Sequence, residues 1–344
     1  MSHTRHPALS VADVTLRGVV CALPQRRVDN DAFQERWGEK AVAEITAMTG
    51  VGARYWADVS QTAGDLCFDA AERLLTRLEW ARDSVDALIF VTQTPDQRMP
   101  ATSCTLHGRL GLANHCQAFD VGLGCSGYVY GVWLAAAMIA AGCTRVLLLA
   151  GDTSSRLIDP ADRATALLFG DAGSASAFER SRSAAPTQFI LGTDGTGAAH
   201  LAVAGGGFRP PADPAAANET LVMDGGAVFS FTLRAVPSLI RTMLDTAGRS
   251  VADVDFFALH QANRFMLRHI AKKLAIAPES MPINIDRYGN TSSASIPLLI
   301  CTDLSERITT GPVNLLLAGF GVGFSWGAAL LDAVELRCAE LLAA

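Results

Sequence analysis

The chain has 344 residues, half of them apolar and 18% charged, and its formal net charge is -6. This length and composition can bury a large core in two domains or in one duplicated domain, so the chain does not read as a disordered one. The acidic balance argues against a general nucleic-acid or anionic-membrane surface but leaves room for a local basic patch.

Five apolar runs, separated by helical stretches, have the composition of buried strands. They cover residues 85–92, 118–121, 146–150, 255–260 and 314–318. Alternation of this kind predicts an α/β protein with largely covered sheets.

Residues 121–144 carry no charge and are numerous enough to span a membrane. The segment is rich in glycine and alanine, and strand-like runs at 117–120 and 145–151 leave no room for interfacial anchors at its ends. We therefore expect a helix buried between sheets rather than a membrane helix.

An internal repeat predicts a duplicated architecture. The run Leu-Leu-Leu-Ala-Gly at 147–151 recurs unchanged at 315–319, and a second pair of strands matches at nearly the same spacing, about half the chain. We predict two similar halves, 1–180 and 181–344, packed about a pseudo-twofold axis. The proline, glycine and alanine residues of 184–218 predict a loop-rich passage into the second half.

The eight cysteines are scattered, with no C-x-x-C pair and no histidine at zinc-site spacing. We interpret them as thiols of a reducing cytoplasm, and no metal site is expected. The first residues, Met-Ser-His-Thr-Arg-His-Pro, lack the apolar core of a signal peptide, which also predicts a cytoplasmic location.

Cys125 lies in a glycine-rich turn, 120–127, that follows a strand and begins the uncharged helix. At a helix N-terminus the dipole and the free N–H groups favour a thiolate, so we expect a nucleophile whose pKa is lowered toward neutrality. The same N–H groups can bind the oxyanion of an acyl transfer. The alternatives are a buried core thiol and a dinucleotide-binding G-x-G-x-x-G loop, with Asp152 after the next strand.

His260 is the best partner for this thiol among the seven histidines. It ends a predicted strand, and active sites of α/β proteins collect at the carboxyl ends of strands. The sequence Gln-Ala-Asn and a helix follow it. For each of the other histidines, a surface or structural role is the simpler interpretation.

Asn290 lies in a second polar turn, 288–294, that leads into a helix. The repeat places this turn near the counterpart of the Cys125 turn, so a pseudo-twofold axis would bring the two face to face. The alternatives are a helix cap and an N-glycosylation sequon, which a cytoplasmic chain would not use. The glycine-dense segment 319–327 is either a β-turn with bulges or the source of an oxyanion-binding N–H.

Together these four elements resemble, in order and separation, the 3-oxoacyl-ACP synthase III family of thiolase-superfamily condensing enzymes. The similarity extends from Gly18 to Leu331. It is carried by Cys-Ser-Gly at 125–127, His-Gln-Ala-Asn at 260–263, Gly-Asn-Thr-Ser at 289–292 and Phe-Ser-Trp-Gly at 324–327, with support from 159–163 and 169–171.

The resemblance implies a five-layered αβαβα thiolase fold, a homodimer and no cofactor. It implies that Cys125 attacks an acyl thioester and holds the acyl group. His260 and Asn290 would then bind the thioester carbonyl of malonyl-ACP while carbon dioxide leaves, and the resulting carbanion attacks the acyl-cysteine. The oxyanion hole would use the backbone N–H of Cys125 and one from the loop formed by Gly321, Val322 and Gly323.

The same resemblance implies contacts to substrate and carrier. Arg163 retains a nucleotide contact, and Asn263 and Phe324 border the substrate. The helix after His260 offers a basic landing site for an acidic acyl carrier protein, with a solvated helix face as the alternative. That site comprises Arg264, Arg268, Lys272 and Lys273.

Three departures from the family concern the substrate. Glu44 and Met48 stand where initiating members have a tryptophan and an arginine that hold the nucleotide of coenzyme A, so both acyl-CoA and acyl-ACP remain open as acyl donors. Met99 stands where those members have a phenylalanine that closes the partner subunit's acyl pocket, and a flexible methionine would admit a longer or different acyl group. Val322 replaces a glycine of the final loop.

The alternatives within this fold are an acyltransferase or thioesterase that delivers the acyl group to an alcohol, amine or water, and a degradative thiolase. The thiolase needs a second cysteine, which 319–327 lacks. A catalytically silent partner subunit is the alternative of another class, but such partners typically lose the nucleophile. The pathway, fatty-acid synthesis or polyketide-like secondary metabolism, stays open.

Overall fold

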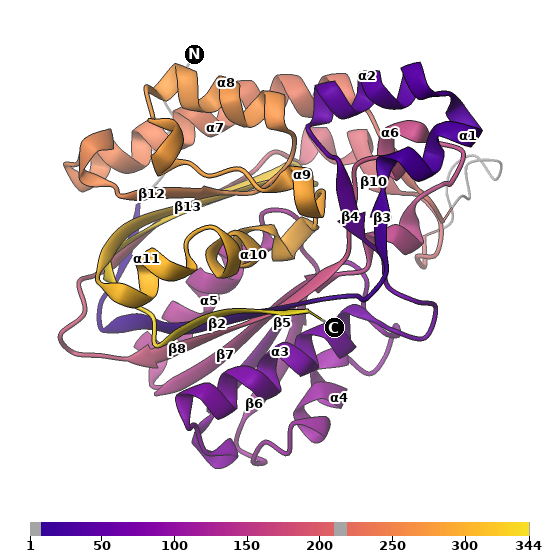
Figure 1. The fold of residues 1–344 in the computed structure, drawn as a ribbon. Coiled ribbons are helices and arrows are strands. Elements are labelled where there is room, and N and C mark those ends of the chain that lie inside the picture. Colours follow the sequence, from indigo (N-terminus) through magenta and orange to yellow (C-terminus); the bar gives the residue numbers. More distant parts are fainter. Residues whose placement is uncertain (1–7, 210–218, 344) are drawn as a thin grey trace.

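The computed structural model describes residues 8–209 and 219–343. Two stacked sheets have helices between them and on both outer faces, so that five layers follow one another from top to bottom of Figure 1. The predicted αβαβα arrangement is therefore confirmed. The two sheets and the central helices share one large apolar core.

The six-stranded sheet comes mainly from the first half of the chain. Its strands run in the order β15 (Cys338–Ala343), β2 (Val14–Leu23), β8 (Ala172–Arg180), β7 (Arg145–Asp152), β5 (Ala87–Val91) and β6 (Gln117–Val121). β5 is parallel to both β6 and β7, and both faces of this region are covered. Strands covered on both faces read as continuous apolar runs, which explains the sequence signal at 85–92 and 146–150.

The five-stranded sheet comes mainly from the second half. Its strands run in the order β1 (Leu9–Val11), β9 (Thr187–Thr193), β14 (Ser325–Val334), β13 (Val313–Gly321) and β12 (Phe256–Leu259). The repeated Leu-Leu-Leu-Ala-Gly lies in β7 and β13, and each of these strands has one parallel and one antiparallel neighbour. The division at residue 180 stays a proposal, because β1 and β15 each join the other half's sheet.

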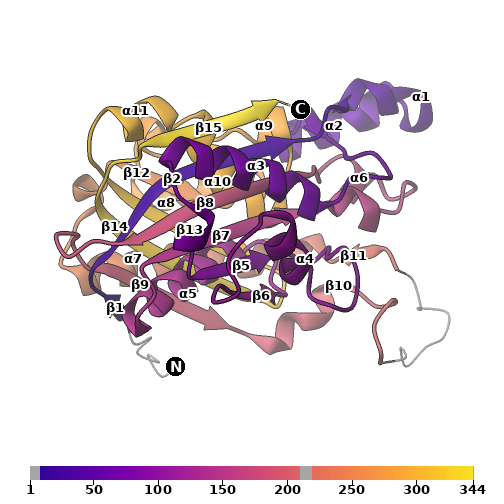
Figure 2. The ribbon, with the colours of Figure 1, turned by 90° about the horizontal axis from the view of Figure 1, so that it is seen from below.

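Helices α5 (Gly127–Ala141) and α10 (Ser295–Thr302) form the central layer. α3 (Ala63–Leu78) and α4 (Thr102–Arg109) cover the outer face of the six-stranded sheet, as Figure 2 shows from below. On the far side, α7 (Gly225–Ala247) covers the five-stranded sheet and packs against α8 (Arg264–Leu274).

The uncharged segment is the buried helix α5, as predicted. Its side chains pack on strands of both sheets, so protein covers its apolar surface and no bilayer is needed to bury it. Among the described residues, only α7 is long and apolar enough to cross a membrane, and it packs against β9, β13 and β14 as a helix that covers a sheet.

The predicted loop-rich passage at 184–218 is wrong in its first part. Residues 187–193 form β9, an interior strand that pairs with β1 and β14, and its Phe189 and Ile190 are fully buried. This short apolar run is hidden in the sequence by the small residues on either side. β10 (Leu201–Val203) then pairs with β11 (Leu221–Met223), and residues 210–218 lie outside the described part of the chain.

Candidate active site

The three predicted catalytic side chains, Cys125, His260 and Asn290, line one cavity of about 690 Å³. Its mouth lies between α2 (Glu39–Thr49), α7 and α8, where Met48 and Phe265 are more than half exposed. The three residues come from distant parts of the sequence. The fold thus brings together the two turns that the repeat predicts to face each other.

Cys125 lies just before the start of α5 and is 8% exposed. Its turn packs against the β13–β14 hairpin, where a Cβ atom on Gly321 would lie 2.8 Å from Cys125 Cβ and 3.0 Å from Sγ. Only glycine therefore allows this close approach of strand and thiol. The hydroxyls of Ser126 and Ser325, 2.6 Å apart, hold the turn on the hairpin.

The resting state of Cys125 is a protonated thiol. Burial and the nearby Asp152 carboxylate raise its pKa to about 12, while the Ser292 hydroxyl and the N–H groups of Cys125 and Val322 act in the opposite direction. This corrects the prediction of a pKa lowered toward neutrality. The helix N-terminus does supply N–H groups, but removing the sulfur from water outweighs them.

Asp152, at the end of β7, is fully buried and joins the two halves beside the thiol. Its carboxylate accepts hydrogen bonds from Gln93 N at 2.7 Å, from Ser293 Oγ at 2.7 Å and from Thr92 Oγ1 at 3.2 Å. Burial raises its pKa, and these bonds oppose the rise. Asp152 thus fixes the Asn290 turn against the strands of the nucleophile half.

His260 directly follows β12 and is 1% exposed. Its Nδ1 lies 2.7 Å from Ser295 Oγ, and the ring of Phe320 meets the imidazole edge-on at 5.4 Å. Burial lowers the pKa of His260 to about 3, and the backbone of Ser292 opposes this only weakly. The imidazole is therefore neutral at physiological pH.

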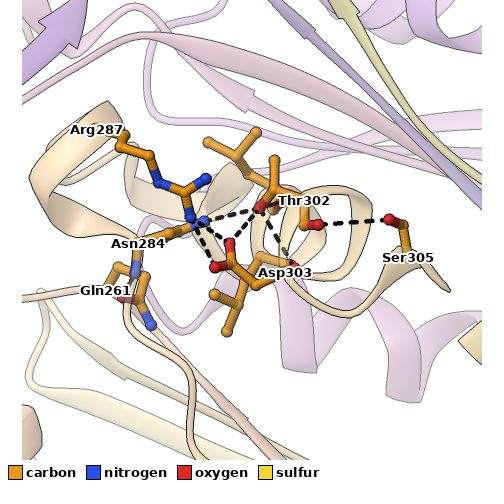
Figure 3. A network of polar contacts seen from close by, with 8 residues as sticks. Gln261, Asn284, Arg287, Thr302, Asp303 and Ser305 are labelled. Carbon is orange, nitrogen blue, oxygen red and sulfur yellow. Dashed lines mark hydrogen bonds and ion pairs between the residues drawn. The ribbon is translucent and has the colours of Figure 1, made fainter. Parts of the chain in front are cut away.

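A polar network links the turn after His260 to the helix that precedes Asn290 (Figure 3). Gln261 Oε1 accepts a hydrogen bond from Asn284 N at 3.1 Å, and Asn284 Nδ2 donates to Thr302 Oγ1 of α10 at 3.1 Å. Asn284 also precedes α9 (Ile285–Tyr288), which leads into the Asn290 turn. The network therefore fixes the two turns relative to each other.

Asn290 is held by its backbone and by its carbonyl oxygen. Its N–H donates to Leu168 O at 2.9 Å, and its Oδ1 accepts the N–H of Ser292 at 2.9 Å. Within residues 8–209 and 219–343 its Nδ2 makes no hydrogen bond, and the residue lines the cavity. Gly289 precedes it with φ +68°, where a Cβ would lie 2.7 Å from Leu168 O. Ser292 has the strained φ of +50°.

The other predicted site residues fall into two groups. Arg163 and Asn263 line the cavity, and Asn263 Oδ1 also caps α8 by accepting the N–H groups of Phe265 and Met266. Met99 is 77% exposed, and neither it nor Phe324 lines the cavity. Phe324 is instead buried in a stack with Phe231 at 4.3 Å, because its loop turns inward there.

Several residues of the site escaped the sequence reasoning. Phe320 lies beside His260 and lines the cavity, whereas Phe324, which was expected to border the substrate, does not line it. The position of Phe320, one residue after Gly319 at the end of a strand, was the available signal. Ser292 was named only as part of the motif at 289–292, and Ser295 lies just after the predicted turn 288–294, at the start of the helix. Their role depends on which way each hydroxyl points, which spacing along the sequence does not reveal.

The basic residues of α8 differ in their surroundings. Arg268 and Lys272 are exposed, and neither side chain forms an ion pair or hydrogen bond with the described part of the chain. Arg264 is half-buried and donates to Gly50 O at 2.9 Å, and Lys273 donates to Leu233 O at 3.2 Å. Only part of the predicted basic face is thus free for a partner.

The structure is similar to that of a 3-oxoacyl-(acyl-carrier protein) synthase from Burkholderia xenovorans, with a TM-score of 0.95, 48% identity and coverage of 98% of this chain and 99% of the other. The fold and site thus define a condensing acyltransferase with the thiolase fold. Models of 3-oxoacyl-[acyl-carrier-protein (ACP)] synthase III and of its C-terminal region match residues 119–195 and 244–333. The chain belongs to the 3-oxoacyl-ACP synthase III family.

Two curated relatives agree with this assignment. The beta-ketoacyl-[acyl-carrier-protein] synthase III 3 of Streptomyces coelicolor is 39% identical over 92% of this chain and 96% of its own length. The beta-ketoacyl-[acyl-carrier-protein] synthase III of Streptococcus suis is 35% identical over 90% of this chain and 96% of its own length. The similarity therefore covers both halves of the molecule.

Proposed function

We propose that this enzyme condenses an acyl group bound to Cys125 with malonyl-ACP, releasing carbon dioxide and 3-oxoacyl-ACP. The observation that carries the proposal is that Cys125, His260 and Asn290 line one cavity, with a thiol from the first half facing two neutral polar groups from the second. The eight free cysteines suit the cytoplasmic location that we propose. The pathway is one that starts or extends acyl chains.

In the first step, the Cys125 sulfur attacks the carbonyl carbon of an acyl thioester. The new C–S bond forms as the donor's C–S bond breaks, and the thiol proton passes to the departing thiolate, so the step balances without another base. In our proposal the oxyanion is bound by the N–H groups of Cys125 and Val322, an assignment supported by their stabilising effect on negative charge at this sulfur. Gly321 and Gly323 give the loop the shape that brings Val322 there.

In the second step, His260 and Asn290 hold the thioester oxygen of malonyl-ACP. Loss of carbon dioxide leaves an enolate whose negative oxygen they stabilise, and its carbon attacks the acyl-cysteine. The Cys125 C–S bond breaks, and the thiolate takes a proton from water. Because burial keeps His260 neutral, with a pKa of about 3, the site binds this oxygen through hydrogen bonds rather than through a full positive charge.

We propose that the acyl group arrives on a carrier protein. Among the described residues that line the cavity, Arg163 is the only one with a permanent charge, and the mouth is otherwise formed by apolar side chains such as Met48 and Phe265. The nucleotide phosphates of coenzyme A would find one cation there. A phosphopantetheine arm needs only an apolar passage, while the exposed Arg268 and Lys272 attract its acidic carrier.

We further propose that the enzyme is a homodimer in which Met99 closes the acyl pocket of the other copy. A small space of about 40 Å³ lies beside Cys125 and is bordered by Gln93, Thr94 and Val322, which suits a short acyl group. Met99 is 77% exposed, and the adjacent Arg98 lies over Phe208, which is 83% exposed. Neighbouring exposed apolar side chains of this size are typical of a covered surface.

The proposal is tested by mass spectrometry of the intact protein after incubation with matched acyl-CoA and acyl-ACP donors, followed by malonyl-ACP. We expect one short acyl mass, loaded faster from the carrier, absent in Cys125→Ala and discharged as 3-oxoacyl-ACP. An acyl group that loads but leaves only to water or to an alcohol would support an acyltransferase or thioesterase instead. Faster loading from coenzyme A would overturn the assignment of the donor.

A further inference from the structure

The hydroxyl group of Ser295 bears directly on the chemistry of His260. Ser295 begins α10, and its Oγ lies 2.7 Å from Nδ1 of the imidazole. Ser295 is 2% exposed and His260 is 1% exposed, so water does not compete for this contact. Among the hydrogen bonds of the described residues, the Ser295 hydroxyl has Nδ1 as its single partner.

The direction of this hydrogen bond decides where the imidazole carries its proton. A neutral imidazole has one N–H, and the nitrogen that receives a hydrogen bond is the one without the proton. If the Ser295 O–H donates, both buried groups are satisfied. If Nδ1–H donates instead, the serine hydrogen is left without an acceptor in a buried site, which is unfavourable.

The other groups around His260 do not impose the opposite direction. The ring of Phe320, on β13, lies nearly perpendicular to the imidazole, the backbone of Ser292 approaches from the turn before α10, and Cys125 and Asn290 share its cavity. None of these is a carboxylate that would hold a proton on the imidazole. Among the described residues, the Ser292 backbone is the one other group that competes for an imidazole N–H.

We propose that Ser295 is a positioning residue, whose O–H donates to Nδ1 of His260 and so keeps the imidazole proton on Nε2. This inference rests on the proposed condensation. With the proton on Nε2, His260 donates a hydrogen bond into the cavity, as the Nδ2 of Asn290 does. The two donors then converge on the thioester oxygen where the enolate charge develops. With the proton on Nδ1, Nε2 would present a lone pair to that oxygen and oppose the step.

The first test reads the proton position without any reaction. In protein labelled with ¹⁵N-histidine, the nitrogen spectrum separates protonated from unprotonated ring nitrogens, and the His260 signals are identified by their loss in His260→Ala. We expect a proton on Nε2 and an unprotonated Nδ1 in the native enzyme, and a mixture in Ser295→Ala. A proton on Nδ1 in the native enzyme would overturn the proposal, whatever the reaction catalysed.

The second test separates the two half-reactions. In Ser295→Ala we expect the loading of Cys125 to be unchanged and the decarboxylation of malonyl-ACP to fall about tenfold in kcat, which is the effect of one lost hydrogen bond. Ser295→Thr, which keeps the hydroxyl, should recover most of this rate. Ser176→Ala is the matched control, because it removes a buried hydroxyl that contacts Tyr128 outside the site.

The outcomes distinguish the positioning role from the proposed function. If the decarboxylation rate falls equally in Ser295→Ala and Ser176→Ala, in proportion to the fall in melting temperature, Ser295 has only a structural role. Unchanged decarboxylation in Ser295→Ala would also contradict the role. If His260→Ala itself decarboxylates malonyl-ACP at the native rate, the function of His260 fails, while the spectrum still reports on the hydrogen bond.

Discussion

The turn that carries Cys125 leads into the central helix α5, and the turn that carries Asn290 leads into the central helix α10, yet the two turns differ in composition. The Cys125 turn is made of glycines and bare backbone, pressed against Gly319 and Gly321 of the β13–β14 hairpin. The Asn290 turn and the start of α10 carry serines instead: the hydroxyl of Ser293 binds Asp152, and that of Ser295 contacts His260. One turn lets an acyl group approach backbone N–H groups, and the other holds neutral side-chain donors in fixed directions.

The largest effect should follow from removing the sulfur. Cys125→Ala should load no acyl group, because no other residue of the cavity can replace the thiol as nucleophile. The Asn290 turn would be untouched, so binding and slow decarboxylation of malonyl-ACP should continue. Release of carbon dioxide from labelled malonyl-ACP measures this remainder, and its disappearance would mean that the two turns do not work separately.

Asn290→Ala should give the complementary defect. Loss of one oxyanion donor costs about 100- to 1,000-fold in rate, so condensation should fall by that factor while loading of Cys125 stays within a few-fold of native. Stopped reactions analysed by intact mass give both rates. Asn314→Ala, which removes hydrogen bonds to Asp253 O and Ala333 N at the far end of β13, is the control outside the cavity.

Gly321→Ala probes the close approach that the Cys125 turn requires. The added methyl would lie 2.8 Å from Cys125 Cβ and 3.0 Å from Sγ, so the turn or the strand has to move. We expect the loading rate to fall about tenfold to a hundredfold, in line with the cost of a small misplacement of reacting groups. Gly311→Ala, with open space around the position of the new Cβ, should load normally.

The last prediction concerns how the reactivity of the Cys125 thiol depends on pH. Because its pKa is raised to about 12, the thiolate fraction of Cys125 should grow about tenfold for each pH unit between 7 and 10. The rate of iodoacetamide labelling of the peptide with Cys125 should follow that slope without levelling off. A plateau near pH 7 would instead support the thiolate expected from the helix N-terminus alone.

Much of the site could be predicted because strand ends and glycine-rich turns have recognisable sequence patterns. His260 stands at the end of a strand, Cys125 at the start of a helix, and the repeat at 147–151 and 315–319 related the two sheets. Their meeting in one cavity followed from the architecture. These features depend on local sequence and on topology, which residue patterns record well.

What the sequence could not supply depends on packing in three dimensions. Strand β9 was missed because its short apolar run lies between Ala-Ala-Pro at 184–186 and Gly-Thr at 192–193. Phe324 was chosen as a substrate contact in place of Phe320 because the same glycine-rich segment carries both rings. The pKa of Cys125 was misjudged because burial, not proximity to a helix, dominates it. The direction of the Ser295 hydroxyl is set by the position of His260, which is 35 residues away.

The Cys125 turn takes up the acyl group, and the Asn290 turn promotes its condensation. The lifetime of the acyl-enzyme in Asn290→Ala tests this separation of roles most directly. The variant is loaded from the preferred donor, freed of excess donor and mixed with malonyl-ACP, and the intact mass is followed beside that of native enzyme. The account predicts that both proteins load fully and that only the native enzyme loses its acyl group quickly. Equal discharge of both, or failure of the variant to load, would contradict it.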